Sequence, residues 1–172
     1  MAGVKIPVFL SCPTILNPEQ TAVRDFITHE MHQLGLEPRA IGRSDYPADF
    51  PLREVLTLAR HCSGGVILGF EQFVATAGTW KPKTEEAETV DSPVGFATPW
   101  NQIEAGVLFA LGKPLLIFRG PRVRGGVFDS GVTDVFVQGM PELLTCASAK
   151  GEGLRGLLLR WQEKVRRVYY GE

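Results

Sequence analysis

TPWNQIEAGVLFALGKPLLIF, residues 98–118, is the stretch that decides the fold class. Thr98 and Pro99 are typical of a helix cap and of the first helical position. Gly112 and Pro114 predict the end of that helix. The apolar residues that follow predict a buried strand. A helix that leads directly into a uniformly apolar strand is typical of parallel α/β domains.

Glu104 is the unexpected residue of this predicted helix. Helical spacing places Trp100, Glu104 and Leu108 on one stripe. Beside that stripe, the residues predicted to face the core are Ile103, Val107, Ala110 and Leu111. A carboxylate in such a position is either a rim residue in water or a functional group in a cleft. The pattern alone leaves both interpretations open.

Strands and helices alternate on both sides of this stretch, as apolar runs and helical periodicity indicate. The predicted elements are a strand over Val4–Ser11, a helix from Asn17 to about Leu34, a strand over Leu36–Ile41, a helix over Leu52–His61, a strand over Val66–Phe70, a short strand over Asp134–Gln138 and a helix over Leu154–Tyr169. We therefore expect an open, doubly wound, flavodoxin-like α/β domain. It would have about five mainly parallel strands, with helices on both faces of the sheet.

Residues 71–97 form the irregular part of the chain. They mix glycine, proline, threonine and acidic residues, and no helical or strand period holds there. A connection of this length is usually a lid, a binding loop or a disordered insertion. We therefore treat residues 1–172 as a single domain that carries this long loop as an insertion.

Length and composition restrict the class of protein. The 172 residues suit one domain with a full core, and 44% hydrophobic and 22% charged residues are ordinary for a globular protein. A net charge of −1 recommends no polyanionic partner, so nucleic-acid binding is not expected. Three cysteines favour a reducing setting. No apolar run is long enough for a membrane helix, so we expect a cytoplasmic protein.

Ligands of doubly wound domains bind outside the carboxyl ends of the strands. Four segments are therefore expected to converge on one crevice. They are residues 11–14, residues 42–51, the start of loop 71–97, and the basic, glycine-rich residues 119–126. The predicted helix of Glu104 begins where the long loop ends, so it borders the same crevice.

Residues of these segments are the candidate ligand contacts. Hydroxyl and amide groups after the first strand suit a ribose or a phosphate, aromatic rings suit a base, and guanidinium groups suit diphosphate oxygens. An ordinary turn, core or solvated role is the alternative for each of them. The candidates for substrate binding are Ser11, Cys12, Thr14, Asp45, Tyr46, Phe70, Trp100, Asn101, Arg119 and Arg122.

Several other types of site are excluded by spacing. Cys12 is not a phosphatase nucleophile, because that loop needs an arginine where Pro18 stands. His29 and His32 are close on a predicted helix, but no further ligand pattern completes a metal site. No Walker loop and no dinucleotide glycine fingerprint are present. We therefore expect no metal and no required cofactor.

Three segments carry a family resemblance. Val8–Ser11 resembles the first-strand motif of TIR domains, and Leu52–Phe70 is similar to their second helix and third strand. Thr98–Glu104 resembles their serine-x-tryptophan-x-x-x-glutamate signature, with Thr98 in the place of the serine. In enzymatic TIR domains this glutamate is the catalytic residue of NAD glycohydrolysis. The resemblance therefore implies that Glu104 is catalytic and that NAD is the substrate.

The same block, continued to Pro114, is also similar to nucleoside 2-deoxyribosyltransferases, whose matching glutamate attacks the deoxyribose carbon. Those enzymes carry an aspartate shortly before the glutamate, where this chain has Thr98. This departure favours the TIR-like interpretation. Residues 42–51 match the loop of TIR domains in placement but poorly in sequence, and the insertion at 71–97 matches neither family.

Cleavage of an N-glycosidic bond passes through an oxocarbenium-like state, which a carboxylate stabilises or attacks. We therefore expect Glu104 to be the catalytic carboxylate of an N-glycosidase that acts on NAD or a related nucleotide. One alternative is a nucleoside or nucleotide hydrolase or a deoxyribosyltransferase. Another is a non-catalytic module that senses a nucleotide or mediates assembly. The resemblance further implies a homo-oligomer, a partner effector protein and a role in bacterial antiviral defence.

Overall fold

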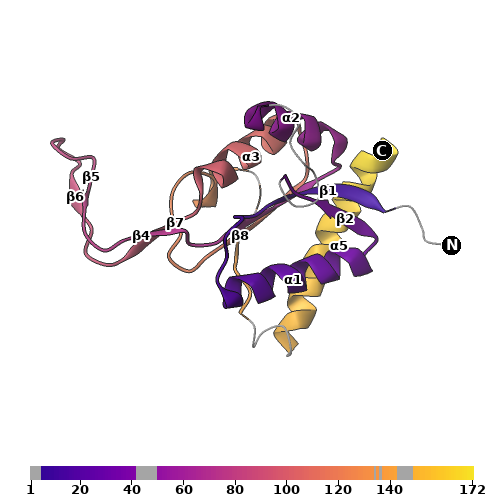
Figure 1. Ribbon diagram of the computed structural model, residues 1–172, viewed down its shortest axis with the longest axis horizontal. Coiled ribbons are helices and arrows are strands. Elements are labelled where there is room, and N and C mark those ends of the chain that lie inside the picture. The colour runs from indigo at the N-terminus through magenta and orange to yellow at the C-terminus, as the bar shows by residue number, and fades with distance from the viewer. Residues whose placement is uncertain (1–4, 42–49, 134, 136, 143–148) are drawn as a thin grey trace.

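A five-stranded parallel sheet lies at the centre of the computed structural model, which describes residues 5–41, 50–133, 135, 137–142 and 149–172 (Figure 1). Its strands, in spatial order, are β2 (Leu36–Arg39), β1 (Ile6–Ser11), β3 (Gly65–Gly69), β8 (Leu115–Arg119) and β9 (Val137–Gly139). Every neighbouring pair is parallel. The predicted doubly wound α/β fold is confirmed, with a strand order consistent with flavodoxin-like sheets.

Helices cover both faces of this sheet. α1 (Pro18–Gln33) and α5 (Ala149–Tyr170) pack on one face, and α2 (Pro51–His61), α3 (Pro99–Ala110) and the short 3-10 helix η1 (Gly126–Phe128) pack on the other. Figure 1 shows these two layers on opposite sides of the strands. The core is therefore divided into two hydrophobic clusters, one on each face.

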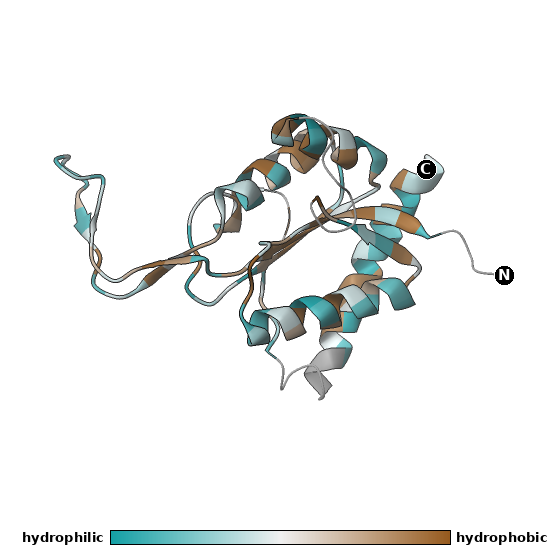
Figure 2. Cartoon of the chain, in the orientation of Figure 1, coloured by the Kyte–Doolittle hydropathy of each residue, from teal (hydrophilic) through white to brown (hydrophobic). Residues whose placement is uncertain are grey.

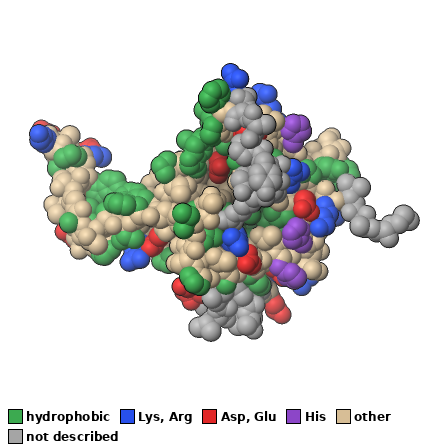
Figure 3. Space-filling view, viewed as in Figure 1, with side chains coloured by type: hydrophobic (Ala, Val, Ile, Leu, Met, Phe, Trp, Pro, Cys, Tyr) green, Lys and Arg blue, Asp and Glu red, His purple; other side chains and the backbone are tan. Residues whose placement is uncertain are grey.

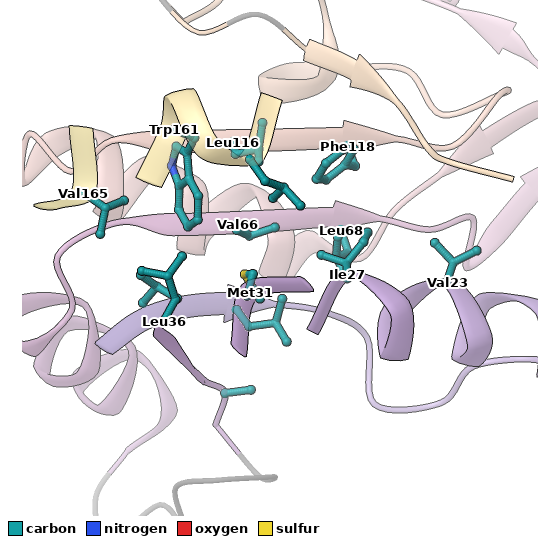
Figure 4. Close-up of a cluster of buried hydrophobic side chains, with 14 of the residues drawn as sticks. Val23, Ile27, Met31, Leu36, Val66, Leu68, Leu116, Phe118, Trp161 and Val165 are labelled. Atoms are coloured by element: carbon teal, nitrogen blue, oxygen red, sulfur yellow. The ribbon is translucent and has the colours of Figure 1, made fainter. Parts of the chain in front are cut away.

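The alternation of side chains along β3 explains why the strands are apolar throughout. Val66 and Leu68 belong to the cluster on the α1 and α5 side, and Ile67 belongs to the cluster on the α2 and α3 side. Figure 4 shows Val66 and Leu68 among side chains that include Met31 of α1 and Trp161 of α5. Hydrophobic residues accordingly run along the central strands (Figure 2).

The starts of two helices follow their capping signals. Asn17 and Gln20 form a reciprocal capping box at the start of α1, and Thr98 and Asn101 form one at the start of α3. Gly112 follows α3 with φ at +63°, in the left-handed region that favours glycine. The predicted boundaries of the Glu104 helix are therefore confirmed.

Two glycines of β3 let the layer of α3 and η1 lie close to the sheet. A Cβ atom at Gly65 would lie 2.5 Å from Leu108 Cδ1 of α3, and one at Gly69 would lie 2.2 Å from Phe128 Cε1 of η1. Larger side chains at these positions would push that layer away from the sheet. This close packing fixes the position of α3 relative to the ends of the strands.

Residues 71–97 differ from the irregular loop that we expected. β4 (Phe73–Ala75) pairs antiparallel with β7 (Val94–Phe96), and farther out β5 (Thr79–Trp80) pairs with β6 (Glu88–Thr89). The two pairs form a β-ribbon that projects from the body of the molecule (Figure 1), and we call residues 72–96 the arm. Strands of two or three residues are too short to show a period in the sequence.

The remaining differences concern the ends of elements. β2 ends at Arg39, before the predicted end, and α5 begins at Ala149, ahead of the predicted start. β9 covers Val137–Gly139, while positions 134 and 136 of the predicted strand lie outside the described residues. No helix in the described part of the chain has the length and apolar character needed to cross a membrane.

Candidate active site

The start of α3 meets the carboxyl end of β1, at the edge of the sheet where ligand sites of this fold occur. Ser11 is the last residue of β1, and Glu104 lies in the second turn of α3. The two elements are in contact. Glu104 is therefore placed at the edge of the sheet that the order of the elements predicted.

The buried face of α3 is rotated from the predicted one. Its buried residues are Asn101, Ala105 and Leu108, whereas Ile103, predicted to face the core, has 40% of its surface exposed. The helix is apolar on most sides, so its period did not identify the inner face, and the polar Asn101 was not counted as a core residue. Glu104, next to Ala105, is partly buried.

A chain of hydrogen bonds links the cap of α3 to Glu104. The Thr98 hydroxyl donates to Asn101 Oδ1 at 2.8 Å, and Asn101 Nδ2 donates to Ser11 Oγ at 2.8 Å. The Ser11 hydroxyl keeps its own proton to donate, and it forms a hydrogen bond with the Glu104 carboxylate. Asn101 and Ser11 are each 1% exposed, so water has little access to these bonds. The carboxylate is thus oriented from both α3 and β1.

The environment of Glu104 changes its acidity. Burial raises the pKa of Glu104 from 4.5 to about 7, because the charged carboxylate loses hydration. The hydrogen bond from Ser11 opposes part of this rise, because it favours the charged form. A carboxylate with a pKa near 7 at the carboxyl edge of a parallel sheet is typical of a catalytic acid, base or nucleophile.

The two aromatic candidates have different surroundings. Trp100 is 43% exposed one helical turn before Glu104, so part of its ring is accessible to a ligand. Phe70 is 3% exposed and belongs to the hydrophobic cluster between the sheet and α1 and α5. Its position is that of a core residue and does not support the predicted contact with a substrate.

Arg119 and Arg122, which were predicted to contact a diphosphate, make hydrogen bonds within the protein. Arg119 Nη1 donates to the carbonyl of Phe128 at 3.0 Å. Arg122 Nε donates to Glu71 Oε1 at 3.1 Å, and Arg122 Nη2 donates to Glu71 Oε2 at 2.6 Å. The hydrogen bond from the Arg122 side chain is the main reason why the pKa of Glu71 is lowered. The two arginines therefore hold η1 and the root of the arm.

The remaining candidates differ in how they are placed. Cys12, partly buried, and Thr14, exposed, follow β1 directly at the carboxyl edge of the sheet, and Cys12 packs against the hydrophobic cluster on the α1 and α5 side. Asn101 is buried, and its side-chain amide is already used in the hydrogen-bond chain, so it positions other groups and does not face a ligand. Asp45 and Tyr46 lie outside the described residues.

Two residues that the sequence did not single out shape the border of the site. Gln102 Nε2 donates to the Gly125 carbonyl at 3.0 Å, and Val127 N donates to Gln102 Oε1 at 2.9 Å. Gln102 thereby holds the loop after β8 against α3. Glu71 holds the same loop to the arm through Arg122. The sequence identified residues 119–126 as a basic, glycine-rich segment, but nothing in it indicated the partners of this loop.

Neither the metal-ligating side chains of the described residues nor comparisons with known proteins assign a function to the site. Within the described residues, no group of three or more His, Cys, Asp or Glu side chains is placed to hold a metal ion. No protein-family model matches the chain, and no curated protein matches it. The chemistry of the site is therefore inferred from its own residues. They are one carboxylate that titrates near neutral pH, a buried serine and asparagine that orient it, and an accessible tryptophan.

Proposed function

We propose that the chain is an N-glycosidase that cleaves the nicotinamide–ribose bond of NAD or a related nucleotide, with Glu104 as the catalytic carboxylate. The observation that carries this proposal is the setting of Glu104, which is partly buried beside the carboxyl end of β1 and hydrogen-bonded by Ser11. The resemblance of Thr98–Glu104 to the TIR signature supports the same choice.

In the proposed reaction, the bond between the ribose C1′ atom and the nicotinamide nitrogen breaks, and its electron pair leaves with nicotinamide. The sugar develops oxocarbenium character, which the ionised Glu104 stabilises or captures as a covalent ester. Water then adds to C1′ and releases one proton. The products are ADP-ribose and neutral nicotinamide.

Nicotinamide is a leaving group that needs no proton donor, and this agrees with the carboxylates that the described residues place at this edge of the sheet. Nicotinamide departs as a neutral molecule from a pyridinium, so it needs no general acid. Glu71, a carboxylate that follows β3 at the same edge of the sheet, is held by Arg122 and has a lowered pKa, so it is a poor proton donor. A base that leaves an uncharged nucleoside would need a proton from an effective general acid. A substrate whose departing ring is already positively charged before the bond breaks is therefore favoured.

Two further roles follow from the geometry. Trp100, exposed one turn before Glu104, is suited to stack on the nicotinamide or another ring of the substrate. Ser11 holds the Glu104 carboxylate, and Asn101 holds Ser11. The structural cap of α3 thereby supports the orientation of the reactive group.

Incubation of the purified protein with NAD, and separately with deoxynucleosides and nucleoside monophosphates, tests the proposal. Free nicotinamide and free base are measured by chromatography. We expect release of nicotinamide from NAD, and a decrease of roughly 10²–10⁴-fold in the rate for Glu104→Gln. Glu152→Gln, which changes an exposed glutamate of α5, is the matched control and should be as active as the wild type.

The other outcomes identify the alternatives. Release of base from nucleosides but not from NAD would replace the proposal by a nucleoside hydrolase or a deoxyribosyltransferase. No turnover of any substrate, even at protein concentrations at which oligomers form, would indicate a binding module. A Glu104→Gln variant that matches the wild type would contradict the role of Glu104 for every substrate.

A further inference from the structure

The root of the arm covers β7 and leaves β4 at the edge of the ribbon. Gly95 of β7 donates its N–H to the Arg122 carbonyl at 2.9 Å, and its carbonyl accepts from Arg124 N at 3.2 Å. The loop after β8 thus occupies the outer side of β7, where Val123 bridges to Gly95. β4 and β7 form a two-stranded sheet of their own. Among the described residues no strand pairs with the outer side of β4, so this side is the open edge of the sheet.

Val74 is the residue whose backbone faces this open edge. It lies directly opposite Gly95 in the β4–β7 pair. Because the N–H and C=O groups of Gly95 point away from β4, Val74 and Gly95 form a non-hydrogen-bonded pair. The N–H and C=O groups of Val74 therefore point outward. One donor and one acceptor on the same residue are what a further antiparallel strand needs for pairing.

The edge lacks the features that usually prevent strands from pairing. Residues 73–78, FVATAG, contain no charge and no proline. Phe73 is 64% exposed and Val74 is 38% exposed. Figure 3 shows hydrophobic side chains gathered along the arm, between the body and a charged tip. Isolated two-stranded ribbons are only marginally stable in water, so an additional strand would stabilise this one.

We propose that β4 pairs antiparallel with β4 of a second copy of this chain, with Val74 on the two-fold axis. Each Val74 donates its N–H to the partner subunit's Val74 and accepts a hydrogen bond in return, so that two ribbons become one four-stranded sheet. In this register Phe73 lies beside the partner subunit's Ala75, and a large side chain meets a small one. The edge is thus complementary to itself, as a two-fold interface requires.

The charges of the arm do not oppose pairing with a second copy. Residues 81–91, which carry four acidic residues and two lysines, lie farther out than β4, whereas residues 73–78 carry no charge. Two copies can therefore pair along β4 without like charges directly opposite each other.

Sedimentation velocity of the full chain over a range of concentrations tests the association. We expect a reversible dimer for the wild type and a monomer for Val74→Pro, because proline removes the outward N–H but no hydrogen bond inside the ribbon. Val74→Thr keeps the N–H and the β propensity, so this matched control should dimerise. The proposal is overturned by a wild type that stays monomeric at every concentration, or by a Val74→Pro variant that dimerises like the wild type.

Disulfide cross-linking tests the register without relying on a variant that removes a backbone group. The Cα atoms of a hydrogen-bonded antiparallel pair lie ~5.5 Å apart, within the range of a disulfide. Val74→Cys should therefore form a covalent dimer on oxidation. Thr76→Cys is the matched control, because its two copies would lie ~13 Å apart along the strands. Equal cross-linking of both variants, or of Thr76→Cys alone, contradicts the proposed axis.

Discussion

The buried carboxylate of Glu104 connects the stability of the protein to pH. The pKa of Glu104 is raised from 4.5 to about 7 in the folded protein, so between these values the folded state binds a proton that the unfolded state releases. The free energy of unfolding should therefore fall as pH rises through this window and level off above it. Glu104→Gln removes this dependence and should be more stable than the wild type by about 3 kcal/mol near pH 8.

Urea unfolding of the wild type and Glu104→Gln at about pH 4 and about pH 8 measures this difference. The stability gap should nearly vanish at the lower pH, because Glu104 is then protonated in both folded and unfolded states. A gap of the same size at both pH values would mean that burial of the charge is not its cause.

Ser11 should set the pH at which the proposed enzyme becomes active. The proposed reaction uses ionised Glu104, so kcat/KM should rise with pH to a plateau, with its midpoint near the pKa of about 7. Ser11→Ala removes a hydrogen bond that favours the charged form, so the pKa of Glu104 and the midpoint should move to higher pH. Profiles of kcat/KM against pH provide the measurement.

A second buried serine serves as the control for this experiment. Ser63 is 7% exposed and lies just beyond the end of α2. Ser63→Ala should leave the midpoint unchanged, even where it lowers stability. If Ser11→Ala has the same midpoint as the wild type, Ser11 does not act on the ionisation of Glu104.

At the scale of elements, Arg122 should hold the arm to the body. Arg122→Lys keeps the charge but loses the planar fork that binds both oxygens of Glu71. Hydrogen exchange at the amides of Gly95 and Arg124, whose bonds close the root of the arm, should become faster. Mass spectrometry of peptides from this region measures the change, and Arg124→Lys is the control. A higher KM with unchanged exchange would instead favour the predicted contact of Arg122 with a substrate.

The sequence predicted those elements whose signals are local. The caps at Asn17 and Thr98 and the glycine at position 112 are read within a few residues, and they were correct. The inner face of α3 was not predictable from its period, because Asn101 is buried through hydrogen bonds with residues that include the distant Ser11. The pairing of β4 with β7 depends on residues about twenty positions apart, in strands too short to alternate visibly.

The difference between local signals and contacts of distant residues also applies to the candidate site. Glu104 and Trp100 became candidates because they share one stripe of one predicted helix and match the signature that the chain resembles. The role of Ser11 toward Glu104 follows from the meeting of β1 and α3, and the pairing of Arg122 with Glu71 follows from the meeting of two loops. Such contacts are properties of the folded chain, so the order of the elements could place these residues at the carboxyl edge of the sheet without assigning partners to them.

Across the whole molecule, the packed body and the projecting arm are separate (Figure 1). Both hydrophobic clusters lie between the sheet and its helices, and the candidate site lies where β1 and α3 meet at the edge of the sheet. The arm beyond its root contributes to neither cluster. The proposed catalysis and the proposed pairing of chains therefore depend on different surfaces, and variants of one should leave the other measurable.

This separation predicts that the outer arm is dispensable for folding. Replacement of residues 76–93 by Asn-Gly joins the facing residues Ala75 and Val94 through a two-residue hairpin. The change removes an exposed segment and the contact of Trp80 with Phe96, at 5.7 Å between ring centroids, so the Tm should stay close to that of the wild type. Leu108→Ala, a control inside the α3 cluster, should instead cost about 2–5 kcal/mol. Calorimetry compares the three chains, and a shortened arm that destabilises as much as Leu108→Ala would show that the arm belongs to the folding unit.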